Sequence, residues 1–398
     1  MTEPESRPGD HTRAVHGPGH VRTGAMSSAV VHSATFSFDT LGDLMREQAR
    51  GVAGAYYQRV GHPTLRAAEE RLAHLEGAEL AVLFPSGMAA IAAVFLSQLK
   101  AGDHVVALHQ SYGGTRALLH WGAERLGWRY DLVDGAAPET WEAAFRPETK
   151  LFHVESPTNP TLCVVDLRRA ATLARRHGAL ASVDNTFASP VGQHPLALGA
   201  DLVVYSATKS IGGHSDLLAG VVAGPALHVR GAAQVRTVFG AAPDPETAWL
   251  IERSLKTLPL RVERQNANAL ALARRLAVHA GVARVHYPGL DSHPGHALAL
   301  AQMERGFGPV LAFELAGGDA VLQPFIERLE LFRHAPSLGG VESLVALPVF
   351  TSHIHMTPAE RVAAGLPDGL IRLAVGIEDE ADLWADLERS LARVAAAT

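Results

Sequence analysis

Apolar and polar positions follow two different periods along the first two thirds of the chain. Residues 64–76 carry apolar side chains three and four positions apart, which predicts a helix that Gly77 ends. Short apolar runs flanked by polar residues come next, separated by helical stretches, within residues 78–87, 103–110, 149–157, 179–186 and 200–209. Strands buried on both faces have such runs, so the alternation predicts an α/β fold with a mostly parallel sheet between two helical layers.

The pattern changes near residue 245. A long helical stretch is predicted over 245–280, followed by short apolar segments at 284–290, 309–315 and 370–377 and a closing helix at 380–396. We therefore expect an N-terminal arm (1–55), a large α/β domain (56–245) and a smaller α+β domain (246–398). The first 13 residues, with their acids and prolines, are expected to form a mobile arm and lack the features of a signal peptide.

Composition excludes several classes of partner. Charged residues make up 19% of the 398 residues, the net charge is −6, and no sustained basic block occurs, so nucleic acid and anionic membrane surfaces are poor partners. No apolar run reaches the length of a membrane span. The single cysteine, Cys163, cannot form an internal disulfide, which suits a reducing cytoplasm.

The chain has four lysines, and one of them stands in unusual surroundings. Lys100 and Lys256 lie at predicted helix ends and Lys150 begins a strand, where a solvated charge is ordinary. Lys209, in "VVYSATKSIGGHSD" (203–216), follows a buried-type strand and two hydroxyl residues. An ammonium group at the end of a buried strand needs a chemical reason.

Other reactive residues also follow predicted strands, where open parallel sheets bind their ligands. These residues are Ser86, Gly87 and Met88 in "FPSGM", Tyr112, Glu155 and Asn159 in "HVESPTNP", Asp184 in "SVDNT", and Ser206 and Thr208 in "YSATK". Each alone is more often a turn or a cap. Together they fit pyridoxal 5′-phosphate (PLP). A helix N-terminus binds the phosphate, an aromatic stacks on the ring, an acid pairs with the ring nitrogen, and the lysine forms a Schiff base.

The sequence resembles the trans-sulfuration, or Cys/Met-metabolism, branch of fold type I (aspartate aminotransferase-like) PLP enzymes. The matching stretches are "YYQRVGHPTLRAAEERLAHLEG", "FPSGMAAI", "SYGGT", "VESPTNPTL", "VDNTFASP", "GADLVVYSATKSIGGHSDLLAG", "SLGGVESL" and "LIRLAVGIEDEADLWADL". The branch includes cystathionine γ-synthase, cystathionine γ-lyase, cystathionine β-lyase, methionine γ-lyase and O-acylhomoserine sulfhydrylase. The resemblance runs from about residue 25 to the end of the chain.

The resemblance implies a role for each matching residue. Lys209 carries PLP and shuttles protons, Asp184 binds the pyridinium nitrogen, and Tyr112 stacks on the ring. The resemblance implies three further contacts. The Gly87 and Met88 amides, with Ser206 and Thr208, hold the phosphate group of PLP, and Tyr57 and Arg59 reach the phosphate group of a neighbouring subunit. Arg372 binds the substrate carboxylate in a pocket that Ser337 and Asn159 also line. An active site shared between subunits implies a homotetramer built as two dimers.

The family also implies γ-elimination or γ-replacement on a sulfur- or homoserine-derived amino acid, with cystathionine γ-synthase or γ-lyase chemistry first. Methionine γ-lyase and O-acylhomoserine sulfhydrylase are the alternatives, and cystathionine β-lyase ranks lower. No charged residue stands at Tyr56, Ala117 or Pro336, where γ-lyases meet the second charged end of cystathionine, although Arg116 is adjacent to one of them. The chain departs from the usual residues at His62, Ser210, Ala374 and Thr351-Ser352-His353, and the resemblance implies that several of these positions lie near the substrate pocket.

Competing sequence interpretations are weaker. A phosphate-binding loop needs glycine before its lysine, where Thr208 stands, and no G-x-G-x-x-G motif follows the early strands. The histidines of "HPGH" (293–296) and "HIH" (353–355) lack further ligands at metal spacing, so no metal site is expected. A binding scaffold without catalysis would be expected to have lost Lys209, Asp184 or Arg372, and all three are present.

Overall fold

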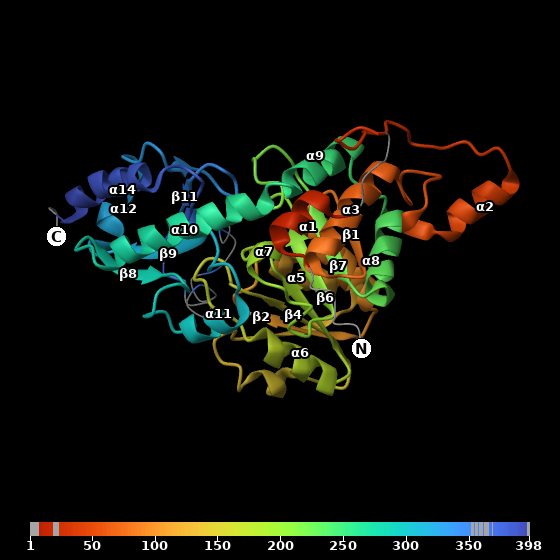
Figure 1. Cartoon of the computed structure of the whole chain (residues 1–398). Coiled ribbons are helices and arrows are strands. Elements are labelled where there is room, and N and C mark those ends of the chain that lie inside the picture. The colour runs from red at the N-terminus through yellow and green to blue at the C-terminus, as the bar shows by residue number, and fades with distance from the viewer. Residues whose placement is uncertain are drawn as a thin grey trace, which may run out of the picture.

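The computed structural model describes residues 8–18, 24–351, 354, 357, 361, 366–367 and 369–395. Two β-sheets organise this part of the chain (Figure 1). The larger sheet has the order β1-β7-β6-β5-β4-β2-β3. Its strands are β1 (Leu80–Phe84), β2 (His104–Leu108), β3 (Arg129–Val133), β4 (Thr149–Glu155), β5 (Leu180–Asp184), β6 (Leu202–Ser206) and β7 (Gly220–Gly224). β7 runs antiparallel to both of its neighbours and the other pairs are parallel, which confirms the mostly parallel sheet.

Helices cover both faces of the large sheet because its strands are apolar on both faces. Successive strand residues point to opposite sides, so Val82 and Phe84 of β1 pack in one core and Ala81 and Leu83 in another. The first core is closed by α4 (Gly87–Gln98), α5 (Gly113–Leu126) and α8 (Ala226–Phe239). The opposite face is covered by α3 (Pro63–Glu76), α6 (Leu167–Arg176) and α9 (Pro245–Leu255).

The second sheet has the order β10-β11-β12-β9-β8 and carries its helices on one face. Its strands are β8 (Val282–His286), β9 (Val310–Leu315), β10 (Arg333–His334), β11 (Leu344–Ala346) and β12 (Ile371–Ala374). Ile371 and Leu373 pack under the helices α10 (Leu258–Ala277), α12 (Leu322–Ile326) and α14 (Glu380–Ala395). The alternate residues Arg372 and Ala374 therefore face the other way, toward the large sheet.

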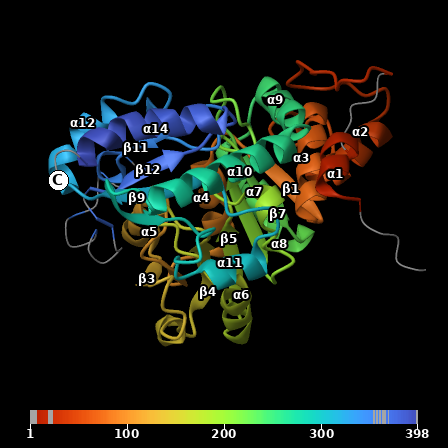
Figure 2. The ribbon, with the colours of Figure 1, turned by 60° about the vertical axis from the view of Figure 1, so that its left-hand side comes forward.

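Helix α10 links the two parts of the molecule, because it reaches from α9 to the strands β8 and β9 (Figure 2). The sequence predicted a long helical stretch over 245–280 with Lys256 at a helix end, and the structure has two helices there, α9 and α10, separated at Lys256 and Thr257. Besides α1, the other helices among the described residues are short: α2 (Leu41–Ala49), α7 (Ser189–Gly192), α11 (His296–Gln302) and the 3-10 turns η1 (Gly51–Ala53), η2 (Trp141–Ala144), η3 (Gly318–Val321) and η4 (Pro348–Phe350).

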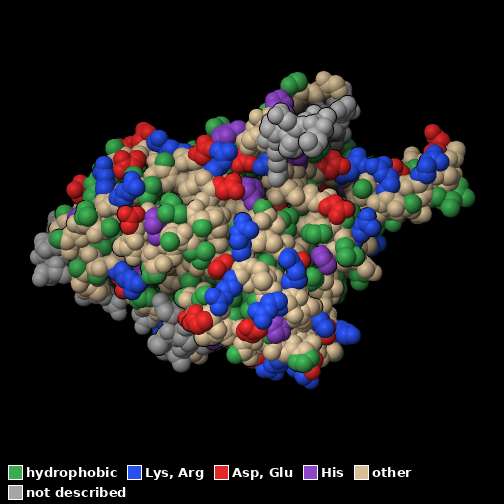
Figure 3. All heavy atoms as spheres, turned by 60° about the horizontal axis from the view of Figure 1, so that its bottom comes forward, with side chains coloured by type: hydrophobic (Ala, Val, Ile, Leu, Met, Phe, Trp, Pro, Cys, Tyr) green, Lys and Arg blue, Asp and Glu red, His purple; other side chains and the backbone are tan. Residues whose placement is uncertain are grey.

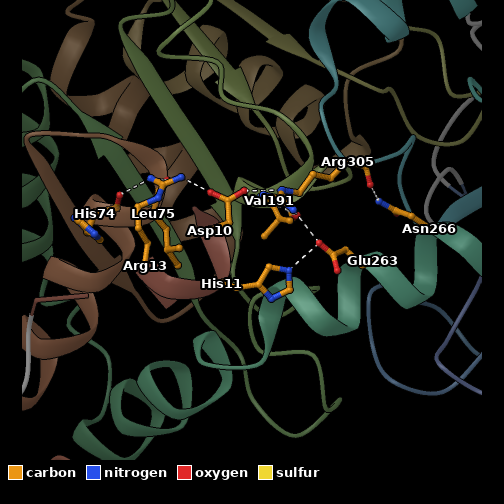
Figure 4. Close-up of polar contacts among 10 residues, drawn as sticks. Asp10, His11, Arg13, His74, Leu75, Val191, Glu263, Asn266 and Arg305 are labelled. Atoms are coloured by element: carbon orange, nitrogen blue, oxygen red, sulfur yellow. Dashed lines mark hydrogen bonds and ion pairs between the residues drawn. The ribbon is translucent and has the colours of Figure 1, made fainter. Parts of the chain in front are cut away.

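Part of the segment expected to be a mobile arm is instead a docked helix, α1 (Asp10–His16). Arg13 is buried and donates two hydrogen bonds to carbonyl groups at the C-terminal end of α3 (Figure 4). Asp10 pairs with Arg13 and with Arg305, and Glu263 of α10 pairs with both Arg305 and His11. These partners come from distant parts of the sequence, so local composition did not indicate the docking.

Basic and acidic side chains alternate over the face that Figure 3 shows, with no extended area of one sign. Within the described residues, no helix has both the length and the apolar character that a membrane crossing requires.

Candidate active site

A cavity of about 600 Å³ lies at the carboxyl ends of β4, β5 and β6, between the two sheets. The structure brings ten of the twelve predicted site residues to its wall: Gly87, Met88, Tyr112, Asn159, Asp184, Ser206, Thr208, Lys209, Ser337 and Arg372. Tyr57 and Arg59 do not line it. Ten further residues complete the wall, namely Ser86, Ile91, Glu155, Thr186, Phe187, Leu218, Pro336, Leu338, Phe350 and Thr351.

Lys209 follows β6 and extends its amine into this cavity. Its Nζ donates a hydrogen bond to the hydroxyl of Ser337 at 2.8 Å. Burial, with a smaller contribution from the positive charge of Arg372, lowers the pKa of Lys209 to about 8. The amine therefore reaches its neutral, nucleophilic form close to physiological pH, which an ordinary lysine does not.

Arg372 is held on the cavity wall by two hydrogen bonds from its guanidinium group. Nη1 donates to Oδ1 of Asn159 and Nη2 donates to the carbonyl oxygen of Ser337, both at 2.9 Å. Burial lowers the pKa of Arg372 to about 10, so it stays charged at neutral pH. Among the described residues, Nε has no hydrogen-bond partner, although the atom is buried. An edge of the planar group with an unused donor suits a carboxylate.

Asp184 ends β5 with a buried carboxyl group. The backbone N–H and the hydroxyl of Thr186 both donate to its Oδ1, at 3.0 and 2.6 Å. Thr186 Oγ1 also accepts a hydrogen bond from the backbone N–H of Ser206 at 2.8 Å, which ties the ends of β5 and β6 together. Burial raises the pKa of Asp184. A positively charged ring nitrogen beside it would favour its ionised form.

The N-terminal end of α4 forms a small concave surface against the end of β6. Ser86 caps the helix by accepting a hydrogen bond from the N–H of Ala89 at 3.1 Å. A Cβ atom at Gly87 would stand 2.8 Å from the Cβ atom of Ser206, so only glycine allows this approach. Uncapped N–H groups and a hydroxyl at a helix N-terminus suit a phosphate group. The hydroxyl of Thr208 also lines the cavity, but it is bonded to the backbone of Ala219.

Tyr112 stands at the start of α5, and its side chain is partly exposed along the cavity wall, where a flat ligand can stack. With the lysine, the buried acid and the helix N-terminus, it completes a set that fits PLP.

Most of the remaining sequence candidates that the structure describes lie away from the cavity. Arg59 stacks on Tyr57 and donates to the carbonyl of Thr237 at 2.9 Å, at the protein surface. His62 is buried away from the cavity, where its Nδ1 caps α3 by accepting from the N–H of Thr64 at 3.3 Å. Ser210 and Ala374 are buried and do not line the cavity, whereas Thr351 does. Ser352, His353 and His355 fall outside the described residues.

Sequence reasoning missed Thr186 and the apolar part of the wall. Thr186 stands two residues after Asp184, a spacing at which side-chain hydrogen bonds to a preceding acid are common, and that signal was available. The apolar wall residues Leu218, Leu338 and Phe350 come from loops whose positions depend on how the two sheets face each other, so no local pattern marks them.

Fold and site together define a PLP-dependent enzyme of fold type I. The chain belongs to the family described as "Cys/Met metabolism PLP-dependent enzyme", whose model matches residues 11–392. This confirms the family, the fold class and the cofactor expected from the sequence.

Several relatives are similar over nearly the whole chain. A cystathionine beta-lyase of Lactococcus lactis subsp. cremoris (strain MG1363) is 41% identical, over 96% of this chain and 98% of that protein. An L-methionine gamma-lyase of Pseudomonas putida is 42% identical, over 96% and 97%. The crystal structure of a cystathionine gamma synthase from Xanthomonas oryzae pv. oryzae, in complex with cystathionine, superposes with a TM-score of 0.93 at 40% identity, covering 99% of this chain and all of that one.

The lowered pKa of Lys209 predicts how cofactor capture depends on pH. Only the neutral amine attacks the aldehyde of PLP, so we expect the rate of capture by the apo-protein to rise with pH and to reach half its plateau near pH 8. Stopped-flow absorbance of the lysine-bound cofactor measures this rate. A half-plateau above pH 10, as for a solvated lysine, would contradict the environment described for this residue.

Proposed function

We propose that this enzyme catalyses γ-elimination or γ-replacement on a sulfur- or homoserine-derived amino acid, with chemistry of the cystathionine γ-synthase or γ-lyase type first. The observation that supports this most is the shared cavity of Lys209 and Arg372, both hydrogen-bonded to Ser337. An amino acid whose carboxylate binds the guanidinium group presents its Cα proton toward the lysine amine. Relatives named for γ-elimination or γ-replacement chemistry are similar to this chain over nearly its whole length.

Each residue has a role in this proposal. When bound, PLP supplies an electron sink that stabilises the carbanion formed when the Cα proton leaves. Lys209 accepts that proton, and γ-chemistry requires a second proton transfer at Cβ. Arg372 binds the substrate carboxylate, with Asn159 and Ser337 holding its guanidinium group. The remaining groups orient the cofactor: Asp184 at the ring nitrogen, Tyr112 on the ring face, and the Gly87 and Met88 amides with the hydroxyls of Ser206 and Thr208 at the phosphate.

The distal part of the cavity favours a substrate with an uncharged end. Apart from Lys209, Arg372, Asp184 and Glu155, the described wall residues carry no charge, and most of the distal wall is apolar. A second ammonium or carboxylate group would be desolvated there without a partner. This apolar wall is the observation that favours methionine γ-lyase and O-acylhomoserine sulfhydrylase activities, which are the second candidates after the cystathionine type.

One panel of substrates tests the proposed function. We expect 2-oxobutyrate from cystathionine, methionine or homocysteine, or a thioether from an O-acylhomoserine with an added thiol, because each outcome requires departure of a γ-substituent. Cysteine is included as a substrate that can lose only a β-substituent. Products are quantified by chromatography of the oxo acids and thioethers.

The panel also decides among the alternatives. A thioether formed only from acyl-homoserine plus thiol would select a synthase or sulfhydrylase over a lyase. Pyruvate from cystathionine, with no 2-oxobutyrate from any substrate, would refute the γ assignment and leave β-elimination, the reaction named for the Lactococcus relative.

We also propose a cytoplasmic homotetramer, built from two dimers that share their active sites. Arg59 and Tyr57 are absent from the cavity of their own chain and lie at its surface. The preceding segment, which protrudes from the body with α2 (Figure 1), has exposed apolar side chains at Met26, Leu41 and Met45. Such a surface supports an interface with a second copy, across which Tyr57 and Arg59 reach the partner's phosphate site. The single cysteine suits a reducing compartment.

Subunit mixing tests the shared site. Lys209→Ala and Arg59→Ala proteins should each be inactive alone, whereas exchange should create mixed dimers in which one site has both residues. Random pairing gives half mixed dimers with one intact site each, so about one quarter of wild-type activity is expected. No recovery under conditions where exchange is shown by native mass spectrometry, or a fully active monomer, would contradict the proposal.

A further inference from the structure

Glu155 is a buried acid on the cavity wall to which neither the sequence motifs nor the proposed mechanism gives a role. It ends β4, and its side chain is nearly inaccessible to solvent. Its two carboxyl oxygens accept hydrogen bonds from two different backbone segments. Oε2 accepts from the N–H of Tyr112 at 2.8 Å, and Oε1 accepts from the N–H of Asn159 at 2.9 Å.

In the proposed mechanism, one of these two segments serves the cofactor ring and the other serves the substrate carboxylate. The N–H of Tyr112 belongs to the residue that directly precedes α5 and lines the cavity. The N–H of Asn159 belongs to the residue whose side-chain oxygen accepts from Nη1 of Arg372. The loop of Tyr112 and the loop of Asn159 follow different strands, β2 and β4, and Glu155 joins them through one carboxyl group.

We propose that Glu155 is a positioning residue that sets the ring of Tyr112 and the guanidinium group of Arg372 at a fixed separation across the cavity. The inference rests on the proposed function, because it assigns Tyr112 to the cofactor ring and Arg372 to the substrate carboxylate. It requires a side chain with two acceptor oxygens and the length of glutamate. Neither glutamine nor aspartate meets both conditions.

The neighbourhood of Glu155 supports a specialised role over simple filling of space. Glu155 is the register partner of Asp184 on the adjacent strand, so two buried carboxyl groups lie side by side. Burial, and next the negative charge of Asp184, raise the pKa of Glu155 to about 8. An apolar side chain at this position would avoid that cost, but it would leave two buried N–H groups without acceptors. The position therefore retains a group that is costly to bury and satisfies both N–H groups at once.

The variant Glu155→Gln tests this role, because it keeps the side-chain length and replaces one acceptor oxygen by an NH₂ group. One of the two backbone N–H groups then faces a donor. We expect KM for the amino-acid substrate to rise roughly tenfold or more, because a buried backbone N–H group loses its acceptor, while kcat changes less. The visible circular dichroism per bound PLP should weaken as Tyr112 shifts, and the dissociation constant of PLP from the apo-protein should rise.

Glu252→Gln is the matched control. Glu252 is an equally buried carboxyl group on α9 that pairs with Arg71 and Lys256 and does not line the cavity. This variant should lower the melting temperature but leave KM and the circular dichroism band at wild-type values. Glu155→Asp, whose shorter side chain cannot reach both N–H groups, provides the same comparison should the glutamine variant fail to fold.

A Glu155→Gln protein with a lowered melting temperature, but with unchanged KM, unchanged dichroism and unchanged PLP dissociation, would overturn the proposal and leave a purely structural role. The dichroism and the PLP dissociation constant are measured without any amino acid. If the wild-type protein turns over no substrate of the panel, these two measurements still decide the role of Glu155. A failure of the proposal for Glu155 can therefore be distinguished from a failure of the proposed function.

Discussion

Replacing Lys209 with alanine is expected to abolish covalent attachment of PLP and to lower turnover by about 10³-fold or more, because the proposed mechanism uses this one amine both as the attachment point and as the proton carrier. The chain has three other lysines, and Lys209 is the one that lines the cavity. Borohydride reduction of the wild-type protein followed by peptide mapping should place the pyridoxyl group on the peptide that contains Lys209.

Lys150→Ala is the control for this prediction, because Lys150 is exposed on strand β4 of the same sheet. It should leave labelling, turnover and cofactor content at wild-type values. Two results would refute the assignment: a pyridoxyl group mapped to Lys100, Lys150 or Lys256, or a Lys209→Ala protein that keeps wild-type turnover. Partial recovery of the Lys209→Ala protein by small primary amines would support the proton-transfer role, since an amine then replaces the missing one.

The layout of the large sheet and its functional edge could be predicted from the sequence because both depend on local order. Continuous apolar runs between helical stretches indicate strands buried on both faces, and ligand sites in such sheets follow the strands. Asp184 directly follows the apolar part of β5, and Lys209 lies just beyond the end of β6. Because parallel strands end at the same edge of a sheet, the two side chains are expected to lie close together there. The position of Arg372 could not be predicted from such a run, and its role came from the resemblance. Its orientation toward the cavity is explained by the alternation of side chains along β12 in the second sheet.

Contacts between distant segments could not be predicted in the same way. The partners of Glu155 follow from the register of β4 on β5 and from the position of the Tyr112 loop, and no sequence period encodes either. Helix α1 looked like a solvated arm because its residues are polar. Its acid and arginine are buried through partners nearly 300 and about 60 residues away. Polar residues that are buried only after the tertiary structure forms have the composition of a surface segment.

Asp184 is the second residue whose replacement should nearly stop the reaction, and the hydrogen bonds around it explain why. Both bonds from Thr186 go to Oδ1, which leaves Oδ2 as the oxygen that remains for the ring nitrogen of PLP. An ionised carboxyl group at that place keeps the ring nitrogen protonated, and a protonated ring withdraws electrons from the substrate carbanion more strongly. The loss concerns the charge rather than the shape of the side chain, so asparagine is the informative replacement.

We expect Asp184→Asn to lower kcat by roughly 10²-fold or more while most of the cofactor is retained, because Lys209 and the phosphate site are unchanged. The control is Asp201→Asn, the same change at a half-buried carboxyl group that accepts from the N–H of Ala181, away from the cavity. It should leave kcat unaltered. Steady-state kinetics with matched cofactor content measure both variants. Full turnover by Asp184→Asn would show that the enzyme does not depend on a protonated ring nitrogen, and would remove the electronic role proposed for Asp184.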